Sequence, residues 1–365
     1  MMSRVVTTDF AREEDTERIL EINRLEYGPQ DILATREDFV WRHSQNPAGK
    51  AIIPVIRNPK NQVVGYIWIV PIRARIKGKD CSVAMGSNLV IHPEYRKGVG
   101  YARLMRCFNS VFRKDEIPLH YSFISEEAYQ RQVIRHPERV ATIPTLVKIY
   151  NSQEVIDSYV QGPLKKNAMK LASRVSSPFL FSKKRKKRDH TIAVKRYEDF
   201  DSRFDEFWQK IQDYHTASVI RDRSFLSWRF AHVSGREYVI LAAESEDRLC
   251  GYAVLRCATV RGIEAGIVAD LMVTDDRSGR NAGHSLLDEA ESWFREHGMA
   301  SSFALISPGS KQYRLLWRAG YIRLPEFLSP RAFRFGVYLH TEQRQDLRSL
   351  TAKDWFVTVA DYESY

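Results

Sequence analysis

Hydrophobic and polar positions follow the same order in the two halves of the chain. Each half begins with an amphipathic helical pattern, continues with apolar runs that predict strands, and ends with a glycine-bearing loop before another helix. In the first half the corresponding segments are 39–42, 63–67, 88–91 and the helix from about Tyr101. In the second half they are 225–229, 249–253, 269–273 and the helix from about Ser285.

The spacing of these landmarks indicates a duplicated domain. Trp-Arg pairs recur 187 residues apart, Gly-Tyr pairs recur 186 apart, and the later strands recur 182 apart, from Leu89 to Leu271. Three landmarks in one order at nearly one spacing are the signature of an internal repeat.

The local patterns predict a mixed α/β (α+β) fold. The runs 67–70 and 253–256 are rich in β-branched and aromatic residues, which favours strands in hairpins. In the helix from Ser285, Leu286, Ala290 and Trp293 form one apolar stripe. We therefore expect a mixed sheet in each of two tandem domains, with an antiparallel part leading into a strand, a loop and a helix.

Composition narrows the class of protein further. The chain has 365 residues, of which 44% are hydrophobic, enough for two domains with real cores. No apolar run approaches the roughly 20 residues of a membrane-spanning helix, and the polar N-terminus does not read as a secretory signal. The four cysteines form no Cys-x-x-Cys pair, so neither a disulfide framework nor a metal site is expected, and the expected setting is cytoplasmic.

The net charge of +11 is concentrated in one segment. Residues 163–190 contain ten basic residues and one acid, so they carry +9 of the total. The segment separates the repeats, which gives an N-terminal domain at 1–160, a basic amphipathic linker at 161–190 and a C-terminal domain at 191–365.

The strongest local motif is the stretch 89–102, LVIHPEYRKGVGYA. A strand ends before a proline, the chain turns through Gly98 and Gly100, and an amphipathic helix begins. Successive backbone N–H groups in such a loop, together with a helix N-terminus, make a site for phosphate groups.

This stretch resembles the coenzyme-A-binding motif of the GCN5-related N-acetyltransferase (GNAT) superfamily. The resemblance implies that Leu89, Val90 and Ile91 bind the pantetheine arm. It implies that the pyrophosphate binds the loop residues Arg96, Lys97, Gly98, Val99, Gly100 and Tyr101. The family usually writes this loop as Arg/Gln-x-x-Gly-x-Gly/Ala, and here Arg96 stands one residue nearer to Gly98. The second half has the family spacing in Arg280, Gly283 and Ser285, so the resemblance extends over most of the chain as a tandem GNAT protein.

The resemblance also implies direct attack of an amine on a thioester, with a base for the amine and often a tyrosine for the leaving thiolate. In the second half the tyrosine position is Leu316, and in the first half it is Gln132. Our candidates for the acid and base are Tyr129, Glu126, Asp270 and His92. A solvated or capping role is the competing interpretation of each.

The basic segment favours an anionic membrane surface as a partner. Apolar residues at helical spacing from Leu164 are followed by Phe179-Leu180-Phe181 and six consecutive cations at 183–188. Nuclear import, nucleic-acid binding and a solvated linker are the alternatives, and the aromatic residues argue against the first two.

We therefore expect an N-acyltransferase with acyl-CoA, acetyl or long-chain, as co-substrate and no permanently bound cofactor. The expected acceptor is a primary amine on a membrane amphiphile, such as a sphingoid base, and residues 164–188 would hold the enzyme at the membrane periphery. One alternative is an acetyl-CoA-dependent amino-sugar N-acetyltransferase of surface polysaccharide synthesis. The other is a catalytically inactive GNAT scaffold that binds lipid or polyanion.

Overall fold

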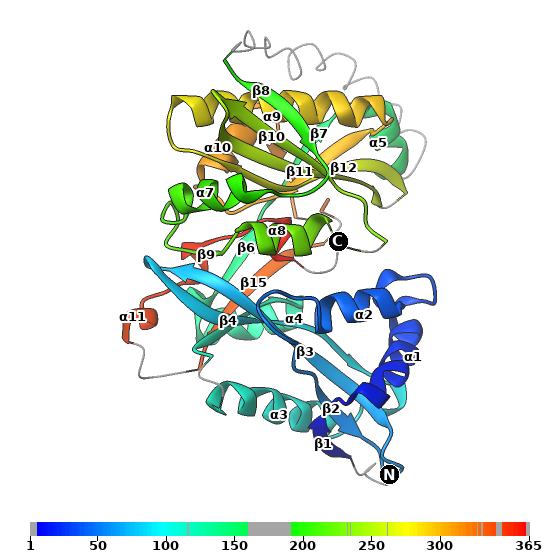
Figure 1. Cartoon of the computed structure of the whole chain (residues 1–365). Helices are drawn as coiled ribbons and strands as arrows, with labels where there is room; N and C mark the ends of the chain where they lie inside the picture. Colours follow the sequence, from blue (N-terminus) through cyan, green and yellow to red (C-terminus); the bar gives the residue numbers. More distant parts are fainter. Residues whose placement is uncertain are drawn as a thin grey trace.

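The protein consists of two mixed sheets with helices on their faces (Figure 1). The computed structural model describes residues 6–114, 117–159, 191–231, 233, 235–260, 262–326, 328–329, 331–340 and 345–362. The predicted basic linker at 161–190 lies outside the described residues. The mixed α/β organisation expected from the sequence is confirmed.

The N-terminal half begins with a short strand and two helices and continues with a long hairpin. Its elements are β1 (Thr7–Phe10), α1 (Thr16–Tyr27), α2 (Arg36–His43), β2 (Pro54–Arg57), β3 (Val63–Ile76), β4 (Lys79–Ile91), α3 (Gly100–Lys114), β5 (Leu119–Ile124), α4 (Glu126–Arg135), β6 (Val140–Ile143), β7 (Thr145–Ile149) and α5 (Ser152–Tyr159).

The C-terminal half repeats this order. Its elements are β8 (Ala193–Tyr197), α7 (Ser202–Ile211), β9 (Ala217–Val219), α8 (Arg223–Leu226), β10 (Val239–Ser245), β11 (Arg248–Val260), β12 (Ile263–Val273), α9 (Arg277–Glu296), β13 (Ser301–Leu305), α10 (Lys311–Arg318), β14 (Ile322–Arg323), β15 (Phe333–Leu339), α11 (Gln345–Arg348) and β16 (Trp355–Phe356).

The two halves exchange a strand. The N-terminal sheet has the order β1-β2-β3-β4-β5-β15-β6, so β15 from the C-terminal half lies antiparallel between β5 and β6. The C-terminal sheet has the order β14-β7-β13-β12-β11-β10-β8, so β7 from the N-terminal half lies antiparallel between β13 and β14. The boundaries drawn from the sequence take no account of this exchange, which makes each sheet depend on both halves.

The tryptophans of the two Trp-Arg pairs found in the sequence contact each other at the centre of the molecule. The rings of Trp41 and Trp228 stack with centroids 4.8 Å apart. The indole nitrogen of Trp41 donates to the carbonyl of Trp228 at 2.8 Å, and that of Trp228 donates to the carbonyl of Trp41 at 3.1 Å. In Figure 1, α2 and α8 lie between the two sheets, whereas α3 and α9 lie on the outer faces. The halves are therefore related by an approximate twofold axis near these tryptophans.

Helix α3 packs on the outer face of the N-terminal sheet because its apolar residues recur at helical spacing. Leu104, Phe108, Val111 and Phe112 are buried against Ile67 and other residues of the strands below. This packing fixes the N-terminus of α3 beside the end of β4, where the predicted site lies.

Candidate active site

Strands β4 and β5 pair briefly and then separate. Their parallel register covers Ala84 with His120 and Met85 with Tyr121, and within the described residues β5 pairs with no later residue of β4. At Gly86 a side chain would not fit, because a Cβ atom would lie 2.7 Å from the hydroxyl oxygen of Ser122. Beyond Gly86, which lies against Ser122, the edge of β4 as far as Ile91 has no ladder partner in β5 among the described residues, and we call this stretch the gap.

Strand β4 is also irregular within this gap. Its register with β3 passes from Trp68–Ser87 to Tyr66–Val90, which leaves Asn88 and Leu89 as a bulge. Asn88 has a φ of 44°, which is uncommon for a non-glycine residue. Such a bulge reorients backbone groups, and one facing the gap can polarise a carbonyl oxygen.

The gap leads to the predicted phosphate loop. Gly98 has a φ of 115°, and no atom lies within 4 Å of the position of a Cβ. Helix α3 starts at Gly100 with no acidic residue in its first turn. Val99 and Tyr101 are 46% and 49% exposed, so the loop is accessible to solvent. Backbone N–H groups and the positive end of α3 can therefore receive an anion here.

The predicted ligands Arg96 and Lys97 lie on the same loop. Arg96 donates from Nε to the carbonyl of Ile91 at 2.8 Å and forms an ion pair with Glu26. These contacts connect the loop to the end of β4 and to α1. Lys97 is exposed.

In the corresponding loop of the C-terminal half, a side chain of the loop itself caps the following helix. The carboxylate of Asp276 accepts a hydrogen bond from the backbone N–H of Gly279 at 2.7 Å and caps α9. This bond lowers the pKa of Asp276, so the carboxylate remains charged. An anion at the N-terminus of α9 would meet this negative charge.

The other predicted ligands in that half serve packing. A Cβ at Gly283 would lie 2.6 Å from Leu315, so this glycine allows α9 and α10 to approach closely. Ser285 is buried and Arg280 is exposed on the same helix. The geometry favours a structural role for Gly283 and Ser285 over the predicted cofactor role.

Asp270 lies in a buried polar network. It accepts from Arg221 Nε at 3.0 Å, from the hydroxyl of Tyr252 at 2.8 Å and from Thr358 at 2.9 Å. Arg221 also pairs with Asp361 at 2.6 Å. Strands β12 and β13 separate after Val268–Ala304, as β4 and β5 do, but the C-terminal segment 355–362 contacts this region. Asp270 therefore holds the C-terminal segment in place, which favours a structural role over the predicted catalytic one.

Glu126 and Tyr129 lie on α4 and contact the exchanged strand β15. Arg334 Nε donates to Glu126 at 2.7 Å, and this contact lowers the pKa of Glu126, which makes it a weaker base. The guanidinium of Arg334 lies 4.3 Å from the centre of the Tyr129 ring, and the Tyr129 hydroxyl accepts from Thr142 at 3.3 Å.

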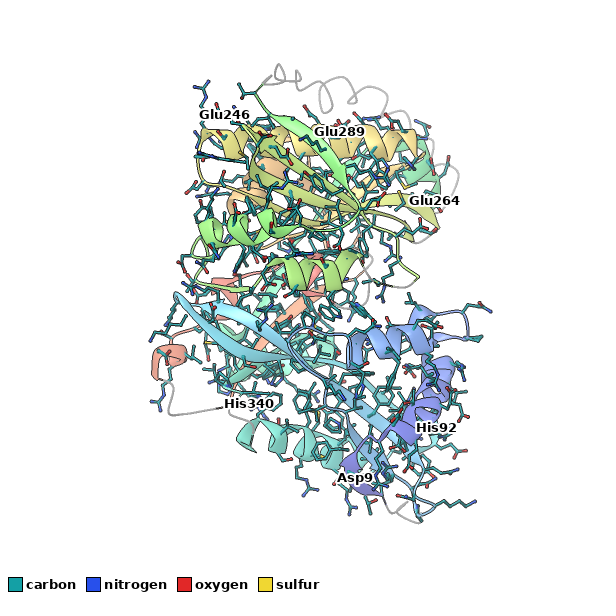
Figure 2. All side chains as sticks on the ribbon, viewed as in Figure 1. Asp9, His92, Glu246, Glu264, Glu289 and His340 are labelled. Carbon is teal, nitrogen blue, oxygen red and sulfur yellow. The ribbon has the colours of Figure 1, made fainter. Side chains whose placement is uncertain are left out.

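His92 lies at the loop end of the gap. Its Nδ1 accepts from the backbone N–H of Glu94, which caps a short helical turn. Six residues separate it from Gly86, which is about 20 Å along a strand. Figure 2 shows His92 and His340 well apart. His340 contacts His120, which pairs with Ala84 where β4 and β5 are still joined.

His92 contacts its own loop, Asp270 contacts the C-terminal segment, and Glu126 and Tyr129 of α4 contact β15. These contacts do not bring the four predicted acid and base candidates into one group.

Ser87 is a candidate that sequence reasoning missed. It pairs across the strands with Trp68, so its side chain faces the core between the halves. Its hydroxyl oxygen is buried and has no hydrogen-bond partner among the described residues. An unpaired buried hydroxyl is costly, and this one lies where the gap opens. No local sequence signal singles it out, because its position depends on where β4 leaves β5.

The part of the chain that the structure describes has neither a membrane-spanning helix nor a cluster of metal ligands. There, no helix combines the length and apolar character needed to cross a membrane. Likewise, His, Cys, Asp and Glu residues form no group of three or more suited to a metal ion within those ranges.

The fold is that of known acyltransferases. A protein from Enterococcus faecalis described as a probable N-acyltransferase matches with a TM-score of 0.61 and 11% identity, over 95% of this chain and 75% of that one. A GCN5-related N-acetyltransferase from Anabaena variabilis matches with a TM-score of 0.60 and 13% identity, over 92% of this chain and 73% of that one. Saccharomyces cerevisiae N-myristoyltransferase, solved with myristoyl-CoA and inhibitors, matches with a TM-score of 0.58 and 13% identity, over 93% of this chain and 80% of that one.

The likeness is confined to structure. The sequence matches no protein-family model and no curated protein. At these identities the comparison establishes the fold, and the chain has a tandem GNAT fold, as its motifs predicted.

Proposed function

We propose that the protein is an acyl-CoA-dependent N-acyltransferase whose donor site is in the N-terminal half. The observation that supports this most strongly is the accessible loop at Gly98, which follows in the chain on the edge of β4 that β5 leaves unpaired. The gap suits the pantetheine arm, which hydrogen-bonds like a strand, and the loop suits the pyrophosphate.

The reaction follows from this placement. The acceptor nitrogen attacks the thioester carbon, the new C–N bond forms, and the C–S bond breaks to release the thiolate of coenzyme A. The acceptor loses one proton and the thiolate gains one. A backbone N–H at the Asn88 bulge would stabilise charge on the carbonyl oxygen, and the Ser87 hydroxyl would hydrogen-bond to the reacting groups.

The contrast between the halves supports a single donor site. Asp276 occupies the N-terminus of α9, and segment 355–362 contacts the second gap. In the N-terminal half, α3 carries no acid in its first turn, so its N-terminus lacks the negative charge that Asp276 places at α9.

A binding experiment with a matched control tests the donor site. Gly98→Val should weaken coenzyme A binding in isothermal calorimetry by about tenfold or more, because a β-branched residue resists the φ of 115° that shapes the loop. Gly298→Val is the control, because Gly298 also has positive φ and open space but lies after α9. Equal affinity in both variants would contradict the assignment.

We propose further that the acceptor is an amine on a membrane amphiphile. The support is the charge of residues 164–188 in the sequence. Liposomes containing anionic lipid should pellet the full chain but not a variant lacking 164–188. Equal pelleting of the two proteins would remove the membrane role of that segment and favour the amino-sugar alternative.

The catalytically inactive scaffold remains the competing function, because the predicted acid and base candidates do not converge. Release of free thiol from acetyl-CoA or palmitoyl-CoA, measured across a panel of amines, separates the two. Binding of coenzyme A without turnover of any amine would favour the scaffold.

A further inference from the structure

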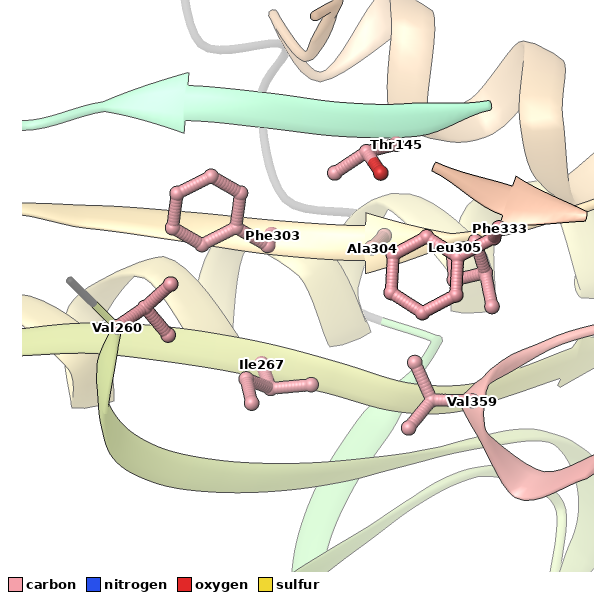
Figure 3. A pocket seen from close by; sticks show the side chains of 8 residues that line it. All are labelled: Thr145, Val260, Ile267, Phe303, Ala304, Leu305, Phe333 and Val359. Carbon is pink, nitrogen blue, oxygen red and sulfur yellow. The ribbon is translucent and has the colours of Figure 1, made fainter. Parts of the chain in front are cut away.

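The C-terminal half contains an apolar pocket on the face of its sheet that is turned toward the N-terminal half. Its volume is about 40 Å³, which is room for a few water-sized groups. Figure 3 shows side chains from β7, β12, β13 and the C-terminal segment around it. The lining residues are Thr145, Val260, Ile267, Phe303, Ala304, Leu305, Phe333 and Val359.

The pocket corresponds in the repeat to the end of the donor gap at which β4 and β5 are last paired, at Met85 and Tyr121. Ile267 pairs with Phe303, as Met85 pairs with Tyr121, and both pairs are related by the 182-residue offset of the repeat. A smaller cavity of about 10 Å³ borders Met85 and Tyr121. Each half therefore has an apolar space at the point where its strands separate.

The chemistry of the lining selects a neutral, apolar ligand. Thr145 is the single polar side chain among the eight residues, and its hydroxyl lies 3.3 Å from that of Ser329. None of the eight carries a charge. A charged or strongly hydrated group would lose its solvation here without compensation, whereas a hydrocarbon group would not.

A chain of aromatic contacts runs from the pocket to the side of the donor gap. The ring centroids of Phe333 and Tyr362 lie 5.5 Å apart, and those of Tyr362 and Phe123 lie 4.7 Å apart. Phe123 lies on β5 two residues after Tyr121, on the side of the gap. Tyr362 also borders the smaller cavity at Met85.

The pocket is lined by both exchanged strands, through Thr145 of β7 and Phe333 of β15. The carboxylate of Asp276 at the N-terminus of α9 disfavours a pyrophosphate there, which argues against the pocket as the end of a second donor site. The acyl group of a donor bound in the N-terminal half would first meet the smaller cavity beside Met85. The remaining substrate is the acceptor.

We propose that this pocket binds the apolar end of the amine acceptor, a neutral group of a few carbon atoms, while the amine reaches the β4–β5 gap. The inference rests on the proposed N-acyltransferase function and adds the acceptor class: a primary amine with a short apolar group, or an amphiphile whose chain begins in the pocket.

Calorimetry with butylamine, hexylamine and octylamine as probes tests the proposal on the full chain with coenzyme A bound. We expect saturable binding that tightens from butylamine to hexylamine and no further for octylamine. Val359→Phe, which fills the pocket, should weaken hexylamine binding by about tenfold. Phe303→Ala, which enlarges it, should shift the preference toward octylamine. Val194→Phe on the edge strand β8 is the matched control and should bind like the wild type.

The outcomes separate this inference from the proposed function. Absence of alkylamine binding to the wild type, or equal hexylamine affinity in Val359→Phe and Val194→Phe, would overturn the acceptor pocket while leaving coenzyme A binding intact. Loss of coenzyme A binding in the wild type would instead contradict the donor site. If Val359→Phe and Phe303→Ala change the affinity for palmitoyl-CoA and not for hexylamine, the pocket holds the donor chain and the proposal is wrong.

Discussion

At the scale of single residues, the proposed donor site combines strained backbone with a polar atom that lacks a partner among the described residues. Asn88 adopts positive φ in the middle of a strand, and the Ser87 hydroxyl before it is buried without a hydrogen bond among the described residues. Both features cost stability in a protein that binds nothing at this point. Their coincidence at the opening of the gap indicates that a ligand completes the site.

Ser87→Ala should lower kcat about tenfold without lowering the melting temperature. The variant removes a hydrogen bond to the reacting groups, while the folded protein loses only an unsatisfied hydroxyl. Ser218→Ala is the matched control, because Ser218 is 1% exposed and its hydroxyl is also unpaired among the described residues. Steady-state kinetics and thermal unfolding check both. A wild-type kcat in Ser87→Ala would exclude the residue from the reaction.

Buried histidines should make the fold sensitive to mild acid. Burial, reinforced by the neighbouring His340, lowers the pKa of His120 well below its ordinary value of 6.5, and burial lowers that of His215 to about 4. Because these pKa values are depressed in the folded state, the stability they contribute is present above pH 6.5. It is lost as the pH falls from there toward the folded pKa values.

His120→Phe should keep the ring stack with Phe112 and remove one titrating group. The free energy of unfolding in urea, measured between pH 7.5 and 5, should depend less steeply on pH in the variant than in the wild type. One titrating proton fewer reduces the slope by up to about 1.4 kcal/mol per pH unit. An unchanged slope would mean that His120 does not remain neutral in the fold.

At the scale of elements, the two strand-loop-helix units differ in how their helices begin. Helix α9 has a capping carboxylate and close-packed glycines, whereas α3 begins at an accessible loop. Repetition of the local sequence therefore does not imply repetition of the binding site.

Asp276→Ala should destabilise the protein by about 1 kcal/mol and leave coenzyme A affinity unchanged, because the carboxylate caps a helix and takes no part in the donor site. Its pKa is lowered, so the contribution of the cap should disappear as the pH falls below about 3.8. Chemical denaturation and calorimetry measure the two effects. A tenfold change in coenzyme A affinity would place the donor in the C-terminal half.

The sequence predicted the repeat, the fold class and the loop after Ile91, because these depend on periodicity, glycine position and local order. It did not predict the exchange of β7 and β15, since a short apolar strand such as 145–149 does not specify which sheet it joins. It also placed Asp270 at a catalytic position, because burial by the distant residues Thr358 and Asp361 cannot be inferred from neighbours in sequence. Ser87 was missed for the same reason.

At the scale of the whole molecule, the strand exchange makes the halves one folding unit. A fragment of 1–159 lacks β15 and would leave β5 and β6 without their shared partner. Strands that lose a neighbour in this way have unsatisfied backbone groups along one edge, and such edges promote aggregation. The paired tryptophans at the twofold axis add a second connection between the halves.

The full chain should therefore unfold in a single calorimetric transition. Fragments 1–159 and 191–365 should be soluble when produced together and aggregate when produced apart. Two separate transitions, or monomeric folded fragments, would show that the exchanged strands are dispensable.

The central claim is that the N-terminal half alone binds the acyl donor, and hydrogen–deuterium exchange with and without acetyl-CoA tests it most directly. The account predicts slower exchange at 86–91 and 96–101 on addition of acetyl-CoA, with no change at 277–285 in the first turns of α9. Protection at 277–285 without protection at 96–101 would contradict it.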